Sequence, residues 1–204
     1  MHKEKLILIG NGMAGVRTLE EVIKMSPEKY DITVFGAEPY TNYNRIMLSP
    51  VLAGEKAFQD IVLNTQEWYD ENKVKLVSGD PIVKIDRVAQ TVEASSGLVE
   101  SYDRLLIATG SNPFIIPVPG HDKSGVIGFR DFEDVEKMLS ASKNYKNAVV
   151  IGGGLLGLEA ANGLMKNGMS VTVVHLLDSL MERQLDKPAS AMLKASLEER
   201  GMSF

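Results

Sequence analysis

The sequence predicts an α/β protein in which short buried strands alternate with helices and pair in parallel. The apolar runs Leu6–Ile9 and Ile32–Phe35 have strand length, and between them Met13–Met25 repeats its apolar residues at helical spacing. Two glycine-rich turns, at residues 10–15 and 152–157, each follow an apolar strand and open a helix. The same strand–turn–helix unit is therefore used twice.

The rest of the chain fits two Rossmann-like domains with parallel sheets, and the first is expected to contain a small β-meander formed by the strands at residues 74–77, 82–85 and 91–94. Further helices are predicted at residues 65–72, 132–145, 155–166 and 187–200, and further strands at 74–77, 82–85, 91–94, 102–108, 148–151 and 171–174. Prolines near residue 118 indicate an extended crossing between domains at 1–118 and 119–204. The second domain has two strands and the start of a third, so we expect it to be truncated.

Composition excludes several classes of function. Lys and Arg number 22 against 27 Asp and Glu, without a basic run, which argues against nucleic-acid binding. No apolar stretch reaches the ~20 residues of a membrane span, so we expect a soluble, cytoplasmic protein. The chain has no cysteine, which excludes disulfides, thiolate nucleophiles and Cys-ligated iron–sulfur clusters within these residues. Its three histidines are scattered, and we predict no protein-bound metal.

The first turn has the dinucleotide fingerprint in its proper setting. Gly10 permits a tight turn, Gly12 lets the backbone approach a pyrophosphate, and Gly15 lets helix and strand pack closely. Met13 and Ala14 open the helix whose N-terminal N–H groups face the phosphates. The alternative is an ordinary turn.

Glu38 is the candidate for the carboxylate that binds the adenosine ribose, because such an acid follows the second strand in this fold. It lies slightly beyond the strand end at Phe35. The alternative is a solvated glutamate in a loop.

The second turn repeats the fingerprint, with cofactor contacts expected at Gly152, Gly154, Leu155, Leu156 and Gly157. Its strand ends in His175, which does not repel a 2′-phosphate as an acid would, so NADP is tolerated; alternatively His175 touches no ligand. Arg183 is expected either to hold a nucleotide phosphate or to lie in a plain charged turn.

These features resemble flavoproteins in which an NAD(P)H domain is inserted into an FAD domain. Residues 102–110 are similar to that group's second FAD motif, which implies FAD contacts at Ala108, Thr109 and Gly110. Within the group, residues 38–54, 152–161 and 181–186 resemble the large subunit of assimilatory NAD(P)H nitrite reductase. The resemblance implies FAD binding by residues 1–118 and NAD(P) binding by residues 119–204.

The resemblance also implies individual contacts. It places Ala14, Ile82 and Arg130 at FAD, Arg45 and Ser49 in a loop along the flavin, and Glu159 at the nicotinamide. Two positions depart from the related ferredoxin reductases, which have a lysine where Pro50 stands and an aspartate where Ala37 stands. Arg130, Ile82 and Glu159 are alternatively ordinary residues of their helices and strand.

The implied activity is hydride transfer from NAD(P)H to FAD, with no catalytic side chain. In the full-length enzyme, electrons would continue through an iron–sulfur cluster and sirohaem to nitrite, and neither centre is held by this chain. A small nitrite reductase subunit and a second copy of the chain are candidate partners, and we expect the fragment alone to be a poor catalyst. The alternatives are a stand-alone rubredoxin or ferredoxin reductase, or a non-catalytic nucleotide-binding module.

Overall fold

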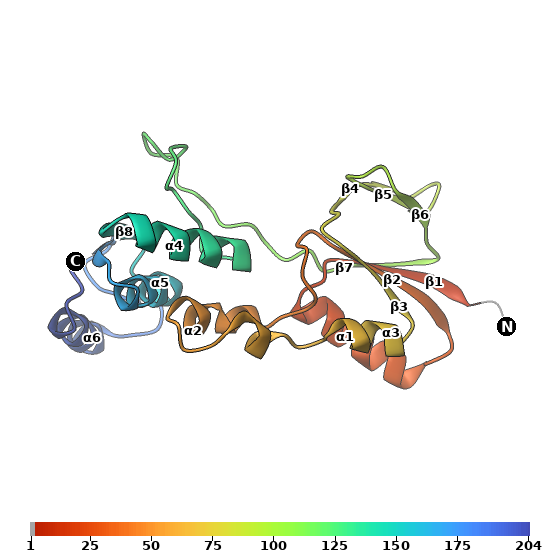
Figure 1. Ribbon diagram of the computed structural model, residues 1–204, viewed down its shortest axis with the longest axis horizontal. Helices are drawn as coiled ribbons and strands as arrows, with labels where there is room; N and C mark the ends of the chain where they lie inside the picture. Colours follow the sequence, from red (N-terminus) through yellow and green to blue (C-terminus); the bar gives the residue numbers. More distant parts are fainter. Residues whose placement is uncertain (1–2) are drawn as a thin grey trace. The chain divides into compact units, whose positions relative to one another are not determined.

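The computed structural model describes residues 3–204 and divides into two compact units. One unit comprises Met1–Asn44 and Ile61–Ser111, and the other comprises Arg45–Asp60 and Asn112–Phe204. Figure 1 traces the elements of both along the sequence. Each unit contains one of the two glycine-rich turns.

The first unit is built on a parallel sheet of four strands in the order β3–β2–β1–β7. The strands are β1 (Glu4–Ile9), β2 (Tyr30–Gly36), β3 (Val74–Ser78) and β7 (Arg104–Ile107). β1 is central, and its Leu8 is in register with Val34 of β2 and Leu106 of β7. The predicted fold class is confirmed: parallel strands alternate with helices.

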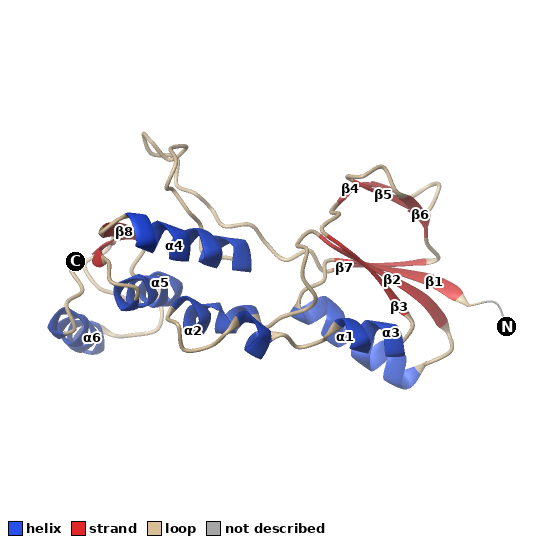
Figure 2. Ribbon diagram, in the orientation of Figure 1, coloured by secondary structure: helices blue, strands red, loops and turns tan. Residues whose placement is uncertain are grey.

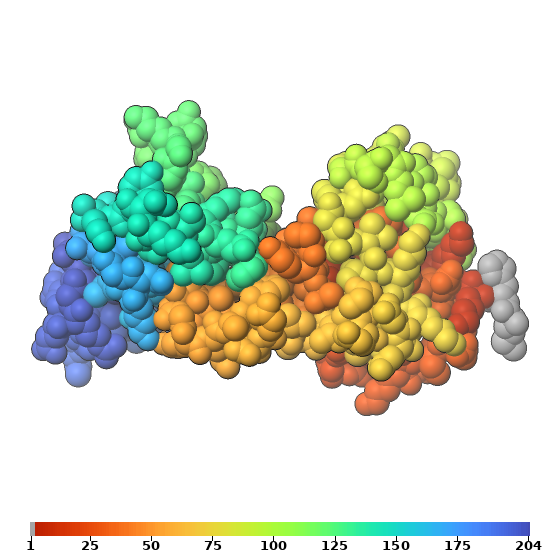
Figure 3. All heavy atoms as spheres, viewed as in Figure 1, coloured from red at the N-terminus to blue at the C-terminus, as the bar shows by residue number. Residues whose placement is uncertain are grey.

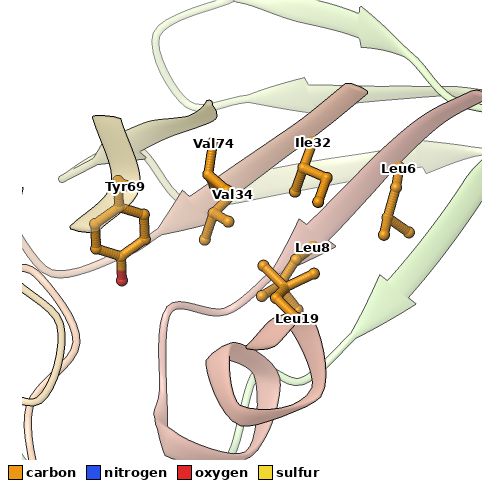
Figure 4. Close-up of a cluster of buried hydrophobic side chains, with 7 residues drawn as sticks. All are labelled: Leu6, Leu8, Leu19, Ile32, Val34, Tyr69 and Val74. Atoms are coloured by element: carbon orange, nitrogen blue, oxygen red, sulfur yellow. The ribbon is translucent and has the colours of Figure 1, made fainter. Parts of the chain in front are cut away.

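Alternate residues of β1 point to opposite faces of this sheet. Helices α1 (Met13–Met25) and α3 (Gln66–Glu71) cover the face that carries Leu6 and Leu8. Figure 4 shows the cluster on that face: Leu6, Leu8, Leu19, Ile32, Val34, Tyr69 and Val74. On the other face, Ile7 packs in a second cluster with Ile9, Phe35, Val92 and Ala94. Burial on both faces explains why residues 6–9 of β1 are continuously apolar.

The second face is covered by a small antiparallel sheet, drawn in red with the other strands in Figure 2. It consists of β4 (Ile82–Asp86), β5 (Thr91–Ala94) and β6 (Val99–Ser101). The first two strands match predicted meander strands, but the meander prediction was wrong for residues 74–77, which form β3 and pair in parallel with β2. Apolar spacing identifies a strand but not the strand with which it pairs. The third strand, β6, was not predicted, because three residues are too few to show an alternating pattern.

The second unit contains two parallel strands, β8 (Asn147–Ile151) and β9 (Ser170–Val174), joined by α5 (Leu155–Lys166). Helices α4 (Phe132–Asn144) and α6 (Lys187–Glu199) precede and follow this βαβ unit. Each begins at an aspartate whose side chain accepts a hydrogen bond from a backbone N–H of the first turn, Asp131 in α4 and Asp186 in α6. The predicted third strand is present as a single parallel bridge from Ser203 to Thr172.

Residues 45–60 belong to the second unit, although they follow β2 in sequence. They form η1 (Arg45–Met47), α2 (Leu48–Leu52) and η2 (Phe58–Ile61). The side-chain amide of Asn167 donates to the carbonyl oxygen of Leu52 at 2.6 Å, and the rings of Phe58 and Phe132 stack with centroids 4.0 Å apart. Figure 3 shows the atoms of residues 45–60 against those of α4 and α5.

None of the helices in residues 3–204 is long and apolar enough to cross a membrane. Over the same residues, no group of acidic and histidine side chains is arranged to hold a metal ion. The two units are defined by contacts within the chain, so the division into an FAD domain at 1–118 and an NAD(P) domain at 119–204 stays a prediction.

Candidate functional site

The first glycine turn is held between β1, β2 and β7. The backbone N–H of Gly10 donates to the carbonyl oxygen of Phe35 at 2.8 Å, and its φ of +107° is one that only glycine adopts readily. A Cβ atom on Gly10 would lie 2.3 Å from the carbonyl oxygen of Ala108. The structure thus brings the first fingerprint together with Ala108 and Thr109 and leaves Thr109 and Gly110 exposed.

The other two glycines of this turn have opposite surroundings. A Cβ atom on Gly15 would lie 2.9 Å from the carbonyl oxygen of Gly10 and 3.1 Å from the Cβ atom of Ala108, so helix α1 packs closely on the turn. A Cβ atom on Gly12 would meet nothing within 4 Å. Packing between helix and turn therefore excludes a side chain at Gly15. At Gly12, in contrast, no protein atom would clash with a side chain. The open space at Gly12 fits a pyrophosphate against the start of α1.

The second turn repeats this geometry in the other unit. Gly152 has a φ of +123°, and its N–H donates to the carbonyl oxygen of Val174 at 2.8 Å. A Cβ atom on Gly157 would lie 2.0 Å from the carbonyl oxygen of Gly152, whereas one on Gly154 would meet nothing within 4 Å. Leu155 and Leu156 follow in the first turn of α5 and are exposed. Both turns therefore offer the same open approach to a phosphate.

Glu38 lies just beyond the end of β2 and is half-buried. Its Oε2 atom accepts a hydrogen bond of 2.6 Å from the hydroxyl of Tyr43, and its carbonyl oxygen accepts from the N–H of Gly79 at 2.9 Å. These two bonds fix both the backbone and the carboxylate of Glu38. A carboxylate fixed in this way is suited to accept hydrogen bonds from a ribose, although the contact itself stays a prediction.

Asn11 and Tyr69 hold the first turn in place, and the sequence did not single them out. The hydroxyl of Tyr69 donates to Oδ1 of Asn11 at 2.7 Å, and Nδ2 of Asn11 donates to the carbonyl oxygen of Tyr40 at 3.2 Å. The Tyr69 side chain is fully buried, and this burial raises the pKa of its phenol to about 12. The available signal was an amide side chain inside the fingerprint, but its partner lies 58 residues away.

Three predicted FAD contacts lie in the second unit. Nη1 of Arg45 donates to the carbonyl oxygen of Arg130 at 3.1 Å, and the N–H of Arg130 donates to Asp134 at 2.8 Å, so these two arginines are brought together. Ser49 donates through its hydroxyl to Oε2 of Glu159 at 2.6 Å. The structure thus pairs a residue predicted to contact the flavin with one predicted to contact the nicotinamide.

The remaining predicted contacts sit at the ends of their elements. Ile82 begins β4 and packs, half-buried, against the cluster around Phe35. Met13 and Ala14 lie in the first turn of α1, with Ala14 exposed. Arg183 lies on the exposed part of the loop between β9 and α6.

His175 follows directly on β9 and faces the second turn. Its Nδ1 atom lies 3.0 Å from the backbone nitrogen of Gly153, which donates to it, and its Nε2 atom lies 3.1 Å from a carboxylate oxygen of Glu182. The sequence left open whether His175 contacts the nucleotide or no ligand, and it predicted neither of these partners.

Comparisons with known proteins agree with this geometry. Residues 4–204 match the family of pyridine nucleotide-disulphide oxidoreductases. The chain is 52% identical over 204 residues to nitrite reductase (NAD(P)H) of Bacillus subtilis, covering all of this chain and 25% of that protein. It is 47% identical to the assimilatory nitrate reductase electron transfer subunit of the same organism, again over the whole chain and 26% of that protein.

Among solved structures, the NADH:rubredoxin oxidoreductase from Clostridium acetobutylicum is similar with a TM-score of 0.87 and 30% sequence identity. The similarity covers 99% of this chain and 52% of that one. The chain therefore spans about a quarter of the length of these curated relatives and about half of this solved reductase.

Proposed function

Since the chain belongs to the pyridine nucleotide-disulphide oxidoreductase family, we propose that it forms the part of a flavoprotein that binds FAD in the first unit and NAD(P)H in the second. When both are bound, the nicotinamide supplies a hydride and the flavin accepts it. The chain's own residues bind and orient the two groups. Its 204 residues include no cysteine, so they carry none of the disulphide chemistry in the family's name.

The paired glycine turns are the observation that carries this proposal. Each unit places a glycine with open space around it, Gly12 or Gly154, at the start of a helix and beside a tightly packed turn. A non-catalytic module would have no need to keep both turns open, which argues against that alternative.

The FAD contacts that we propose in the first unit surround its turn. The backbone of Ala108 and Thr109 lies against Gly10, and Glu38 is held by Tyr43 beyond the end of β2. Ile82 completes this set on resemblance alone. Arg45, Ser49 and Arg130 lie in the second unit and are also assigned to FAD only by resemblance. The corresponding contacts that we propose for NAD(P)H are Gly154, the first turn of α5, Glu159, His175 and Arg183.

In the longer protein we propose that the electrons go on to nitrite, through an iron–sulfur cluster and sirohaem held outside these residues. The support is the identity to the two Bacillus subtilis proteins of nitrite and nitrate reduction. A small nitrite reductase subunit and a second copy of the chain are the proposed partners. The second candidate is a reductase of a small electron carrier, which the similarity to the NADH:rubredoxin oxidoreductase favours.

Two matched substitutions test the nucleotide assignments. Gly12→Val and Gly154→Val place similar side chains in open space at extended backbone, so both chains should fold. We expect Gly12→Val to lose FAD, measured as flavin absorbance after gel filtration, while it keeps NAD(P)H binding. Gly154→Val should show the reverse. Full flavin retention by Gly12→Val would falsify the placement of FAD in the first unit.

The electron acceptor is tested with the full-length protein. Incubated with NADH under anaerobic conditions, it should convert nitrite to ammonium and should reduce added rubredoxin more slowly. Reduction of rubredoxin without ammonium formation would favour the second candidate.

A further inference from the structure

The end of β9 lacks the acid that the fold usually places there to bind the adenosine ribose of NAD. Val174 ends the strand, and His175 occupies the next position. A histidine at this position does not by itself determine whether the second unit binds NADH or NADPH. The hydrogen-bond partners of the imidazole indicate which of the two it binds.

Both nitrogens of His175 are engaged within the protein. Because Nδ1 accepts the N–H of Gly153 at 3.0 Å, it carries no proton, and the proton is on Nε2. Nε2 then donates to the carboxylate of Glu182 at 3.1 Å. The imidazole is therefore a bridge from the glycine turn to a carboxylate and has no nitrogen left to receive a 2′-phosphate.

The loop that carries Glu182 is folded back onto the same turn. The N–H of Met181 donates to the carbonyl oxygen of Gly153 at 3.0 Å, and the side chain of Leu180 is buried. Met181 has a φ of +51°, an uncommon value for a residue with a side chain, which is maintained by this packing. A Cβ atom on Gly153 would lie 2.6 Å from Leu180 and 2.9 Å from His175, so the turn, the imidazole and the loop fit closely.

We propose that Glu182, positioned by His175, is the carboxylate that binds the adenosine ribose hydroxyls, so that this site takes NADH in preference to NADPH. The carboxylate is one imidazole ring away from the glycine turn, and about a third of its side chain, 32%, is exposed. The inference rests on the proposed function and deepens it. It replaces the NADPH tolerance predicted from His175 alone, because the acid is present but comes from a later loop.

The chemistry of the site supports this choice. The backbone N–H of residue 182 and the neighbouring His175 and Arg183 lower the pKa of the Glu182 carboxyl, so it is charged at neutral pH. A charged carboxylate accepts hydrogen bonds from two ribose hydroxyls and repels a 2′-phosphate. Arg183 is adjacent to Glu182 in the sequence, and its positive charge would favour a 2′-phosphate. The experiment therefore includes substitutions of both Glu182 and Arg183.

The test measures dissociation constants of NADH and NADPH for the chain by fluorescence titration. We expect the wild-type chain to bind NADH more tightly. Glu182→Gln should weaken NADH about tenfold, the loss expected for one charge-assisted hydrogen bond, without weakening NADPH. Asp178→Asn is the matched control, since it removes a carboxylate of the same loop that is 82% exposed, and it should leave the NADH-to-NADPH ratio unchanged.

Two results would overturn the inference: an unchanged ratio in Glu182→Gln, or a wild-type preference for NADPH that Arg183→Ala abolishes. Failure of the proposed function looks different. In that case the wild-type chain binds neither dinucleotide, or Gly154→Val binds both as tightly as the wild type.

Discussion

Ser49 donates its hydroxyl hydrogen to a carboxylate oxygen of Glu159 at 2.6 Å, and both side chains are half-buried. Ser49 lies in α2 and Glu159 in α5, 110 residues apart in the sequence. This bond connects the excursion after β2 to the helix that follows the second glycine turn. A change at either side chain should therefore affect the position of the other, in any role that they have at a cofactor.

The Ser49–Glu159 bond should appear as an energetic coupling. We expect Ser49→Ala to lower the free energy of unfolding by about 1.5 kcal/mol, the value for a hydrogen bond to a charged group. In a Glu159→Gln background the same change should cost about 1 kcal/mol less, because the charged acceptor is gone. Urea denaturation of the four chains measures this cycle. Additive effects would show that the contact contributes nothing to stability.

Gly163 tests whether residues 45–60 pack on α5. A Cβ atom on Gly163 would lie 2.6 Å from Cγ of Leu52, so Gly163→Ala should destabilise the chain by about 1 kcal/mol, as overpacking exceeds the gain in helix propensity. In a Leu52→Ala background the two nearest atoms, Cγ and Cδ2, are absent, and the closest remaining atom of residue 52 is Cβ at 3.3 Å. There the same substitution should become stabilising by about 1 kcal/mol, measured by urea denaturation. The same sign in both backgrounds would contradict this packing.

Gly154 and Gly157 of the second fingerprint should differ in what they control. Gly157→Ala forces a Cβ atom to within 2.0 Å of the carbonyl oxygen of Gly152 and should cost about 3 kcal/mol of stability. Gly154→Ala meets no protein atom within 4 Å and should leave stability unchanged while it weakens NAD(P)H binding. Circular dichroism in urea and a dinucleotide titration separate the two effects. Equal stability losses would mean that the turn is packed differently.

Tyr69 should remain protonated well above the ordinary phenol value of 10.0, since burial raises its pKa to about 12. A raised pKa in the folded state means that this group stabilises the fold fully below pH 10 and loses that contribution as the pH rises through about 12. The wild-type absorbance at 295 nm minus that of Tyr69→Phe should therefore titrate near pH 12. A midpoint near 10 would mean that the phenol is exposed.

Tyr69→Phe should also cost about 1 kcal/mol at neutral pH, because Asn11 loses its donor. Tyr145→Phe is the matched control, since its side chain is exposed, and it should have no measurable effect. If Tyr145→Phe lost as much stability as Tyr69→Phe, the loss could not be attributed to the hydrogen bond between Tyr69 and Asn11.

The local geometry of the two glycine units was predictable from sequence. The bounds of α1 and α5 are those predicted, because a glycine turn starts each helix and a 3.6-residue apolar period continues it. The resemblance placed residues 108–110 at FAD, and Ala108 and Thr109 lie against Gly10, while their contact with FAD stays a prediction.

Contacts between distant segments were not predictable in this way. Nothing in the five-residue helix α2 indicates that it packs on α5, and Leu52 meets Asn167 across 115 residues. The partners of His175 were missed because Glu182 lies in a loop without periodicity, where a left-handed residue, Met181, reverses the chain. Such contacts depend on how loops close in three dimensions, which apolar spacing does not record.

Helices α4 and α6 begin at aspartates that satisfy their own first-turn N–H groups, whereas α1 and α5 begin at glycines with no side-chain cap and no acidic residue in the first turn. An anion bound at the N-terminus of α1 or α5 therefore accepts hydrogen bonds from first-turn N–H groups that have no side-chain cap, and it stabilises the helix. Ligand binding should raise the thermal stability of the chain. At a ligand concentration 100 times the dissociation constant, the free energy of unfolding increases by about 2.7 kcal/mol. The melting temperature of this chain should accordingly rise with the logarithm of either nucleotide concentration, which makes a simple thermal scan an assay for each half.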